Sequence, residues 1–193
     1  MDMKLINAQR KVQILKKYLH EGMSVLDFGC GDLVFAQELF KAMPSLHITG
    51  VDVVDFGSRP KGIRFKKYDG KSLPFKKASF DIVISYHVFH HTPTPFALLF
   101  ECMRVAKKQV LFVEPVYRGL WDIPGMRIMD WFFNAWKDHA ISMPYAFASK
   151  SDWMNEIKKA RFLCTDQIDV ELLPKFLPTG RSLLFVCKKI HAF

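Results

Sequence analysis

The residues from Met23 to Gly31 (MSVLDFGCG) join an apolar run to a carboxylate and two glycines. Such a run is typical of a buried strand ending in a glycine turn, where the backbone comes close to a bound small molecule. Asp27 precedes this turn, and a carboxylate there would repel a pyrophosphate but attract an ammonium group. Val34 stands where a dinucleotide-binding fingerprint needs its third glycine. These residues therefore predict recognition of a cationic small molecule.

A second acidic residue follows at the distance that nucleoside recognition requires. The apolar run His47 to Val53 (HITGVDV) reads as a second strand and contains Asp52 near its end. In doubly wound α/β units, an acidic residue about 20 positions after the glycine turn hydrogen-bonds the hydroxyls of a ribose. Asp52 is predicted to take that role.

Three histidines, His87, His90 and His91, form the third group that could do chemistry. An imidazole titrates near neutral pH, so His87 or His91 could remove a proton from an accepting atom. The alternative is that these residues open a helix and serve packing or backbone hydrogen bonds. No carboxylate or cysteine nearby in the sequence completes a ligand set, so no metal site is predicted.

The elements that must position these residues alternate along the chain. Residues Leu5 to Leu19 form an amphipathic helical pattern, and Leu33 to Met43 form another. Alternating helices and strands predict a mostly parallel sheet covered on both faces. The expected strands are centred near Val25, Ile48, Ile63, Ile82, Val110, Ile168 and Leu183.

The ordered motifs from Met23 to Pro115 carry a resemblance to a known family. After VLDFGCG and Asp52, the chain reads DGKSLPF at Asp69 to Phe75 and SFDIVISYHVFHH at Ser79 to His91. In this order and spacing, the sequence resembles the class I S-adenosylmethionine-dependent methyltransferases, most closely the small-molecule, methyltransferase type 11-like members.

The resemblance implies an α/β architecture, the Rossmann-like methyltransferase fold. This fold is a three-layer sandwich with a seven-stranded, mostly parallel sheet in the order 3-2-1-4-5-7-6. The last strand, Arg181 to Lys188, would be antiparallel. We expect one methyltransferase domain over residues 1–193.

The resemblance also implies a cofactor, S-adenosyl-L-methionine, with S-adenosyl-L-homocysteine as product. Asp27 and the backbone of the glycine turn would hold its amino acid end, Asp52 its ribose and Asp69 its adenine amino group. Ser85 and Tyr86 would lie near the sulfonium. The full set of expected cofactor-binding residues is Asp27, Phe28, Gly29, Cys30, Gly31, Asp52, Val53, Asp69, Gly70, Ser85 and Tyr86, with His87 and His91 as the expected catalytic residues.

One position departs from the family pattern. Leu33 stands where these methyltransferases commonly have glycine, which places a side chain near the cofactor or the helix start. Either binding survives this change, or it is weaker and the site is degenerate. A cofactor-binding but catalytically inactive interaction domain is therefore the alternative to an enzyme.

An aromatic insertion at about 116–150 is long for a connection between two strands. We expect it to form a lid that lines a pocket for a small, hydrophobic acceptor. Met126, Met129, Phe133 and Trp136 recur at helical intervals, so packing against the sheet is the competing interpretation.

The charge and composition limit the partners. The chain has 28 Lys and Arg against 19 Asp and Glu, a formal net charge of +9. A dispersed excess of this kind is typical of a solvated surface, and RNA methylation stays an alternative. Aromatic and basic residues of the insertion suggest a peripheral membrane contact. No apolar run spans a bilayer and no signal peptide is recognised, so a cytoplasmic location with four free thiols is predicted.

Overall fold

The computed structural model describes residues 2–134, 144–170 and 179–190 of the chain. Two compact units divide it. The first comprises residues 1–85 and 101–109, and the second comprises residues 86–100 and 110–193.

The helical elements are α1 (Met3–Leu15), η1 (Lys16–Tyr18), α2 (Val34–Ala42), η2 (Phe89–His91), α3 (Pro95–Val105), α4 (Asp122–Asn134) and α5 (Lys150–Lys159). The strands are β1 (Ser24–Phe28), β2 (His47–Asp52), β3 (Ile63–Lys67), β4 (Phe80–Tyr86), β5 (Ala106–Tyr117), β6 (Ala148–Ser149), β7 (Phe162–Asp169) and β8 (Arg181–Lys189). η1 and η2 are single turns of 3₁₀-helix.

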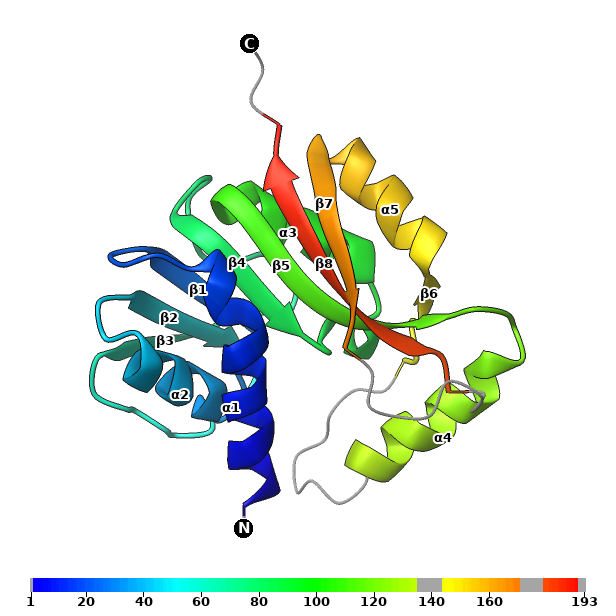
Figure 1. The fold of residues 1–193 in the computed structure, drawn as a ribbon, viewed down its shortest axis with the longest axis horizontal. Coiled ribbons are helices and arrows are strands. Elements are labelled where there is room, and N and C mark those ends of the chain that lie inside the picture. The colour runs from blue at the N-terminus through cyan, green and yellow to red at the C-terminus, as the bar shows by residue number, and fades with distance from the viewer. Residues whose placement is uncertain (1, 135–143, 171–178, 191–193) are drawn as a thin grey trace. The chain divides into compact units, whose positions relative to one another are not determined.

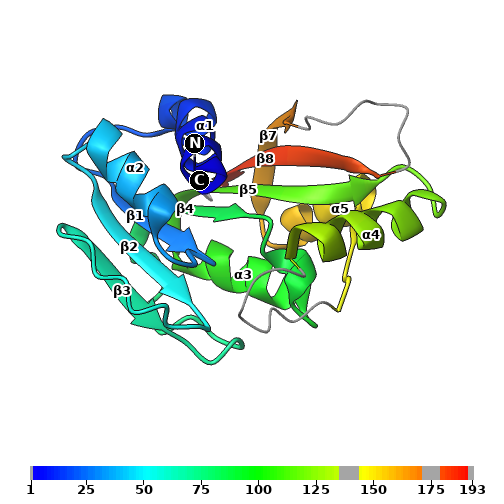
Figure 2. The same cartoon turned by 90° about the horizontal axis from the view of Figure 1, so that it is seen from below.

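The first unit is built on parallel strands. β1 pairs with β2 on one side and with β4 on the other, and β2 pairs with β3. Strands that are buried on both faces are continuous apolar runs, and this is why β1 reads SVLDF with only Ser24 less than fully buried. Helices α1 and α2 lie side by side over these strands (Figures 1 and 2).

The second unit contains the antiparallel pair β7 and β8, with α5 packed beside β7 (Figure 1). Its aromatic core surrounds Trp153 of α5, which is fully buried. The Trp153 ring lies 5.7 Å from Phe89 and 5.3 Å from Phe112, measured between ring centroids. Ser149 begins α5 with a capping box that it forms with Asp152.

The strand order confirms the predicted fold. The strands follow one another as β3-β2-β1-β4-β5-β8-β7, and β6 pairs with β5 off this path. The predicted order 3-2-1-4-5-7-6 corresponds to this arrangement once the two-residue β6 is passed over. The antiparallel last strand is also confirmed. The first predicted helix ends earlier than expected, at Leu15, and a 3₁₀ turn takes its place up to Tyr18.

Candidate cofactor and catalytic sites

Asp27 is a buried carboxylate in the middle of apolar neighbours. It lies on β1, its residue is 5 % exposed, and its Oδ2 has no hydrogen-bond partner among the described residues. Burial raises the pKa of Asp27 to about 7, with Lys11 acting against this rise and Asp52 adding to it. A buried acid without a partner is costly to the fold, and a cationic ligand would compensate its charge.

The glycine turn after β1 is held by hydrogen bonds within the protein. The N–H groups of Gly29 and Cys30 both donate to the Val51 carbonyl, at 2.9 and 3.2 Å. The N–H of Gly31 donates to Asp52 Oδ2 at 2.9 Å. The three amides of the turn that were expected to face a ligand therefore already have partners within the protein, whereas Asp27 Oδ2 has none among the residues that the structure describes.

Asp52 joins the turn to the end of β2. Besides Gly31, its carboxylate accepts the N–H of Val54 through Oδ1 at 3.1 Å. A carboxylate offers about four lone-pair sites, so these two bonds leave acceptor capacity for the hydroxyls of a ribose. The hydrogen bonds from Gly31 and Val54 also fix the Asp52 side chain in place.

Leu33 has the conformation that glycine normally supplies. Its φ is 68°, in the left-handed region that costs a non-glycine residue roughly 1–3 kcal/mol. The side chain is 1 % exposed, and burial of a leucine contributes roughly 1.5–3 kcal/mol, which offsets the strain. Leu33 is also the N-cap of α2 and provides no side-chain cap, while Asp32 Oδ1 lies 3.4 Å from the Val34 N–H.

Gly50 of β2 makes room for this leucine. A Cβ on Gly50 would lie 2.4 Å from Leu33 Cδ2 and 2.7 Å from Cys30 Sγ, closer than real carbon atoms approach. Leu33 therefore packs against the strand at Gly50. The Leu33 side chain, which the sequence places near the cofactor or the helix start, is thus buried against β2 where α2 begins.

Asp69, Gly70 and Val53 come together after β3 and β2. Asp69 Oδ1 accepts the N–H groups of Lys71 and Ser72, at 2.9 and 3.0 Å, and these two bonds lower the pKa of Asp69. Gly70 has a φ of 79°, and a Cβ there would lie 3.4 Å from Val53 Cγ1. Val53 is 45 % exposed, so it offers an apolar surface next to a sharp turn, which suits a flat base.

The other expected cofactor residues of the first unit are buried. Phe28 is fully buried with its ring 5.9 Å from that of Tyr68. Cys30 is 8 % exposed, and burial raises the pKa of its thiol far above the usual range. Ser85 of β4 pairs with Phe28 in the sheet, and its Oγ is buried without a partner among the described residues. Ser85 Oγ is thus, after Asp27 Oδ2, a second buried polar atom without a partner in the described part of the chain.

In the second unit, Tyr86 and His87 form a stacked pair, with ring centroids 5.0 Å apart and an interplanar angle of 28°. His87 takes a positive φ of 57° and donates its N–H to the Val113 carbonyl at 2.8 Å. The backbone thus turns sharply where β4 ends.

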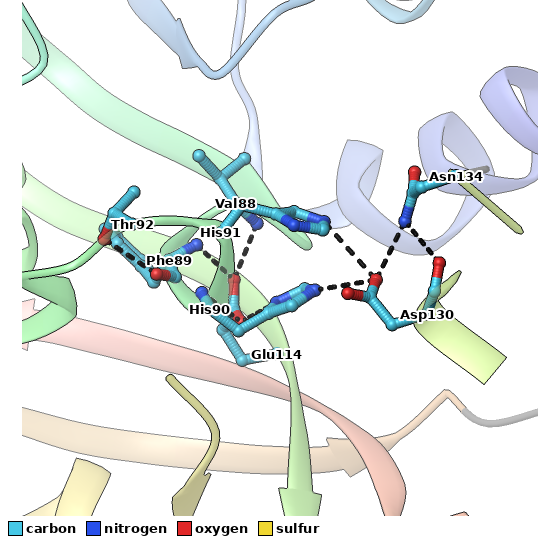
Figure 3. Close-up of polar contacts among 8 residues, drawn as sticks. All are labelled: Val88, Phe89, His90, His91, Thr92, Glu114, Asp130 and Asn134. Atoms are coloured by element: carbon cyan, nitrogen blue, oxygen red, sulfur yellow. Dashed lines mark hydrogen bonds and ion pairs between the residues drawn. The ribbon is translucent and has the colours of Figure 1, made fainter. Parts of the chain in front are cut away.

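Glu114 of β5 holds the short helix that carries the other two histidines. Its carboxylate accepts the N–H groups of Val88, Phe89 and His90 at 2.8, 2.8 and 3.3 Å. It also lies 2.6 Å from His90 Nδ1 (Figure 3). Burial acts to raise the pKa of Glu114, but these contacts outweigh it and the pKa is lowered.

Asp130 of α4 completes this cluster. Its Oδ1 lies 3.5 Å from His90 Nε2 and 3.5 Å from His91 Nε2. Burial would lower the pKa of His90, but the carboxylates of Glu114 and Asp130 raise it to about 9. His91 therefore has a carboxylate beside it that can orient its ring, an arrangement found in general bases.

Sequence reasoning missed His90, Glu114 and Asp130 as members of one cluster. Signals for two of them were present, since Glu114 directly follows the apolar run Val110 to Val113 within β5, and Asp130 lies four residues after the buried Met126 on α4. An acid within such a run calls for a buried partner. Their separation from His90 in the sequence hid the partner.

The aromatic insertion contains α4 and β6, while residues 135–143, including Trp136, lie outside the described residues. Met126 is buried, as the helical stripe predicted. Five large apolar residues around the start and along α4 are more than half exposed: Leu120, Trp121, Ile128, Trp131 and Phe132. Among the described residues, no helix is both long and apolar enough to cross a membrane.

Comparison with a family model identifies a methyltransferase domain over residues 26–113. This range contains every expected cofactor-binding residue and the three histidines that follow β4. None of the curated protein sequences matches the chain.

Solved structures match nearly the whole chain at low identity. Magnesium protoporphyrin IX methyltransferase from Synechocystis PCC 6803, determined with bound S-adenosylhomocysteine, has 15 % identity and a TM-score of 0.66, covering 97 % of this chain and 84 % of its own. A complex of the Haloferax volcanii Trm112 methyltransferase activator with a methyltransferase gives 17 % identity, a TM-score of 0.67 and coverage of 98 and 97 %. The [4+2]-cyclase SpnF has 16 % identity and a TM-score of 0.70, and the match covers 94 % of this chain and 80 % of SpnF.

These findings confirm the resemblance drawn from the motifs. Residues 26–113 match the model of a methyltransferase domain, and the fold is that of the class I S-adenosylmethionine-dependent methyltransferases.

Proposed function

We propose that this chain transfers a methyl group from S-adenosyl-L-methionine to a small, hydrophobic acceptor. The observation that carries the proposal is the buried carboxylate of Asp27, whose Oδ2 has no partner among the described residues. An ammonium group satisfies such an oxygen through a charge-assisted hydrogen bond.

The residues around Asp27 fit the cofactor. Asp27 would accept from the ammonium of its amino acid end, Asp52 from its ribose hydroxyls and Asp69 from the adenine amino group. Val53 and Gly70 would contact the adenine ring. Ser85 Oγ, buried without a partner among the described residues, offers a further polar contact. The cofactor supplies a methyl group activated by a sulfonium, so the protein's task is mainly to position the acceptor.

The acceptor's chemistry is inferred from α4 and the residues before it. Ligand pockets are lined mostly by aromatic and apolar side chains, and Ile128, Trp131 and Phe132 expose such groups on α4. We propose that this segment is the lid over an apolar acceptor such as a lipid or quinone precursor. Two hollows on the described surface lie elsewhere, one on α5 near Phe96 and one beside His47 and Arg64.

Proton removal from the acceptor is assigned to His91, with His87 as the other candidate. Asp130 at 3.5 Å from His91 Nε2 would orient the ring and stabilise its protonated form. An acceptor that loses its proton readily would need no such base.

Two alternatives have specific support. The internal use of the turn's amides and the strained Leu33 favour a domain that holds the cofactor without transferring a methyl group, and the cyclase SpnF shows this fold in a protein named for another reaction. The net charge of +9 favours an RNA methyltransferase, because excess positive charge attracts a nucleic acid.

The exposed apolar residues near α4 also favour a peripheral membrane contact. Trp121, Trp131 and Phe132 are exposed, and Arg118 and Arg127 lie in the same stretch of chain. Aromatic and basic side chains together bind the interface of anionic membranes. Such a contact would bring an apolar acceptor within reach.

Titration calorimetry with S-adenosylmethionine and S-adenosylhomocysteine tests the cofactor assignment. Asp27→Asn should lose most of the affinity, because the amide cannot supply a negative charge. Asp32→Asn is the matched control, since Asp32 lies in the same turn but pairs with Lys4 at the surface. Equal affinity of Asp27→Asn and wild type would contradict the assignment.

Turnover is then tested on His91→Ala. We expect cofactor affinity to stay unchanged and methyl transfer to a panel of apolar hydroxyl and thiol acceptors to fall. Cofactor binding without transfer to any acceptor would favour the non-methylating alternative.

A further inference from the structure

The imidazole rings of His90 and His91 point at the same carboxylate, that of Asp130 (Figure 3). The side chains are 3, 17 and 10 % exposed, respectively. One donor atom from each of the three residues lies within 4.8 Å of the other two. Two imidazoles and a carboxylate thus converge in a place with little access to water.

The distances in this cluster suit shared ligation better than hydrogen bonding. Asp130 Oδ1 lies 3.5 Å from both Nε2 atoms, beyond the roughly 2.7–3.2 Å of an N–H···O hydrogen bond. Ligands about 2.1 Å from a tetrahedral ion are separated by about 3.4 Å from one another. The two nitrogen-to-oxygen distances match that separation.

Surrounding groups fix the donor atoms in the orientation that ligation needs. Glu114 lies 2.6 Å from His90 Nδ1, which leaves Nε2 to face Asp130. A carboxylate on the far nitrogen of a ligating histidine is the usual second contact in metal sites. Asn134 donates to Asp130 Oδ1 at 2.8 Å and fixes the third side chain.

The cluster is incomplete without a further positive group. Asp130 Oδ2 is buried and has no hydrogen-bond partner among the described residues. An unsatisfied carboxylate oxygen at this depth costs free energy. A cation bound at the carboxylate would satisfy it.

We propose that His90, His91 and Asp130 bind one divalent transition-metal ion, of which Zn²⁺ is the prime candidate. Two imidazoles with one carboxylate suit zinc, iron or cobalt, whereas Ca²⁺ and Mg²⁺ prefer oxygen ligands. The ion replaces the Nε2 proton of His90. Three protein ligands leave a coordination position open for water or for a hydroxyl or thiol.

This site does not depend on binding of the cofactor; with an ion on its Nε2, His91 is no longer the base proposed above, and His87 is the remaining candidate. All its residues belong to the second unit, and its test requires no cofactor and no acceptor. A failure of cofactor binding would leave the metal site standing, and the reverse also holds.

Cobalt is the probe for the test, because Co²⁺ held by protein nitrogen and oxygen ligands in a four- or five-coordinate site absorbs strongly in the visible range. The untagged full-length protein, stripped with a chelator, is titrated with Co²⁺ and then with Zn²⁺ as competitor. We expect one equivalent to bind, the visible band to saturate and Zn²⁺ to abolish it. Asp130→Asn should weaken binding at least about tenfold and change the spectrum.

Two further sets of variants make the test decisive. Should Asp130→Asn fail to fold, His91→Ala carries the same expectation, since that side chain is the most exposed of the three. His20→Ala and His47→Ala remove exposed histidines of the first unit and should bind like wild type. Weak, unsaturated binding, equal binding by Asp130→Asn and wild type, or loss of binding in either control would overturn the proposal.

Discussion

The pKa of Asp27 predicts a pH-dependent affinity for S-adenosylmethionine. Burial raises this pKa to about 7, so the ionised form that attracts an ammonium is scarce in weakly acidic solution. About half of the molecules carry the charged carboxylate at pH 7.0 and about 3 % at pH 5.5. Because only the ionised fraction binds, the apparent Kd should rise about 15-fold between pH 7.0 and pH 5.5.

The pH range is chosen so that the ligand does not titrate. An α-amino group has a pKa of about 7.7–8.0, so the ammonium stays protonated below pH 7. Binding at pH 5.5 must then release nearly one proton from Asp27. Titration calorimetry in two buffers with different ionisation enthalpies measures that proton directly.

Two variants separate Asp27 from other titrating groups. Asp27→Asn should bind weakly with no slope between pH 5.5 and 7.0, whereas Asp32→Asn should keep the wild-type slope. A wild-type affinity that stays constant over this range, or a slope that persists in Asp27→Asn, would refute the role assigned to the carboxylate.

Three other outcomes follow from the geometry. Asp27→Asn should raise the melting temperature of the ligand-free protein at pH 8 but not at pH 4. The reason is that a carboxyl whose pKa is raised by folding contributes stability below its pKa in the unfolded chain, and this stability is lost as pH rises through about 7. An equal shift in melting temperature at both pH values would contradict this. Gly50→Ala should lower the free energy of unfolding, and adding Leu33→Ala should recover at least about 0.5 kcal/mol relative to additivity in a denaturant-based double-mutant cycle; strict additivity would show that the two side chains do not collide. The Trp131→Ala, Phe132→Ala double variant should sediment less with anionic lipid vesicles than wild type, and equal sedimentation would exclude these residues from a membrane contact.

The sheet could be predicted from the sequence because its strands are buried. Each central strand is a short apolar run, and the alternation of strands with helices predicts that the strands are mostly parallel. The order of the strands was implied by the resemblance to the methyltransferases. The two-residue strand β6 could not be predicted, since Ala148 and Ser149 carry no periodicity. Its pairing with β5 depends on where the chain returns after α4.

The candidate cofactor residues could be proposed from the motifs, but their hydrogen bonds could not be predicted. The types and spacing of Asp27 and Asp52 pointed to a cation and a ribose. That the amides of Gly29 and Gly31 bond to Val51 and Asp52 depends on the direction of each peptide plane, which residue types do not specify.

The histidine cluster was hidden by distance along the chain. The sequence around the three histidines contains no nearby carboxylate. The carboxylates that contact His90 belong to Glu114 and Asp130, which lie 24 and 40 residues further along the chain. Side chains from separate elements meet only through the tertiary fold. Reasoning from spacing finds ligands on one helix or turn and misses sets of this kind.

The fit of Leu33 against Gly50 predicts that the two positions are epistatic. Considered alone, a leucine at the position where the family commonly has glycine is unfavourable. Considered together with Gly50 on β2, which has no side chain, Leu33 fills the space that Gly50 leaves. In a homologue with a larger residue at the position of Gly50, a leucine introduced at the position of Leu33 would collide with that residue. The two changes can therefore accumulate only in a restricted order.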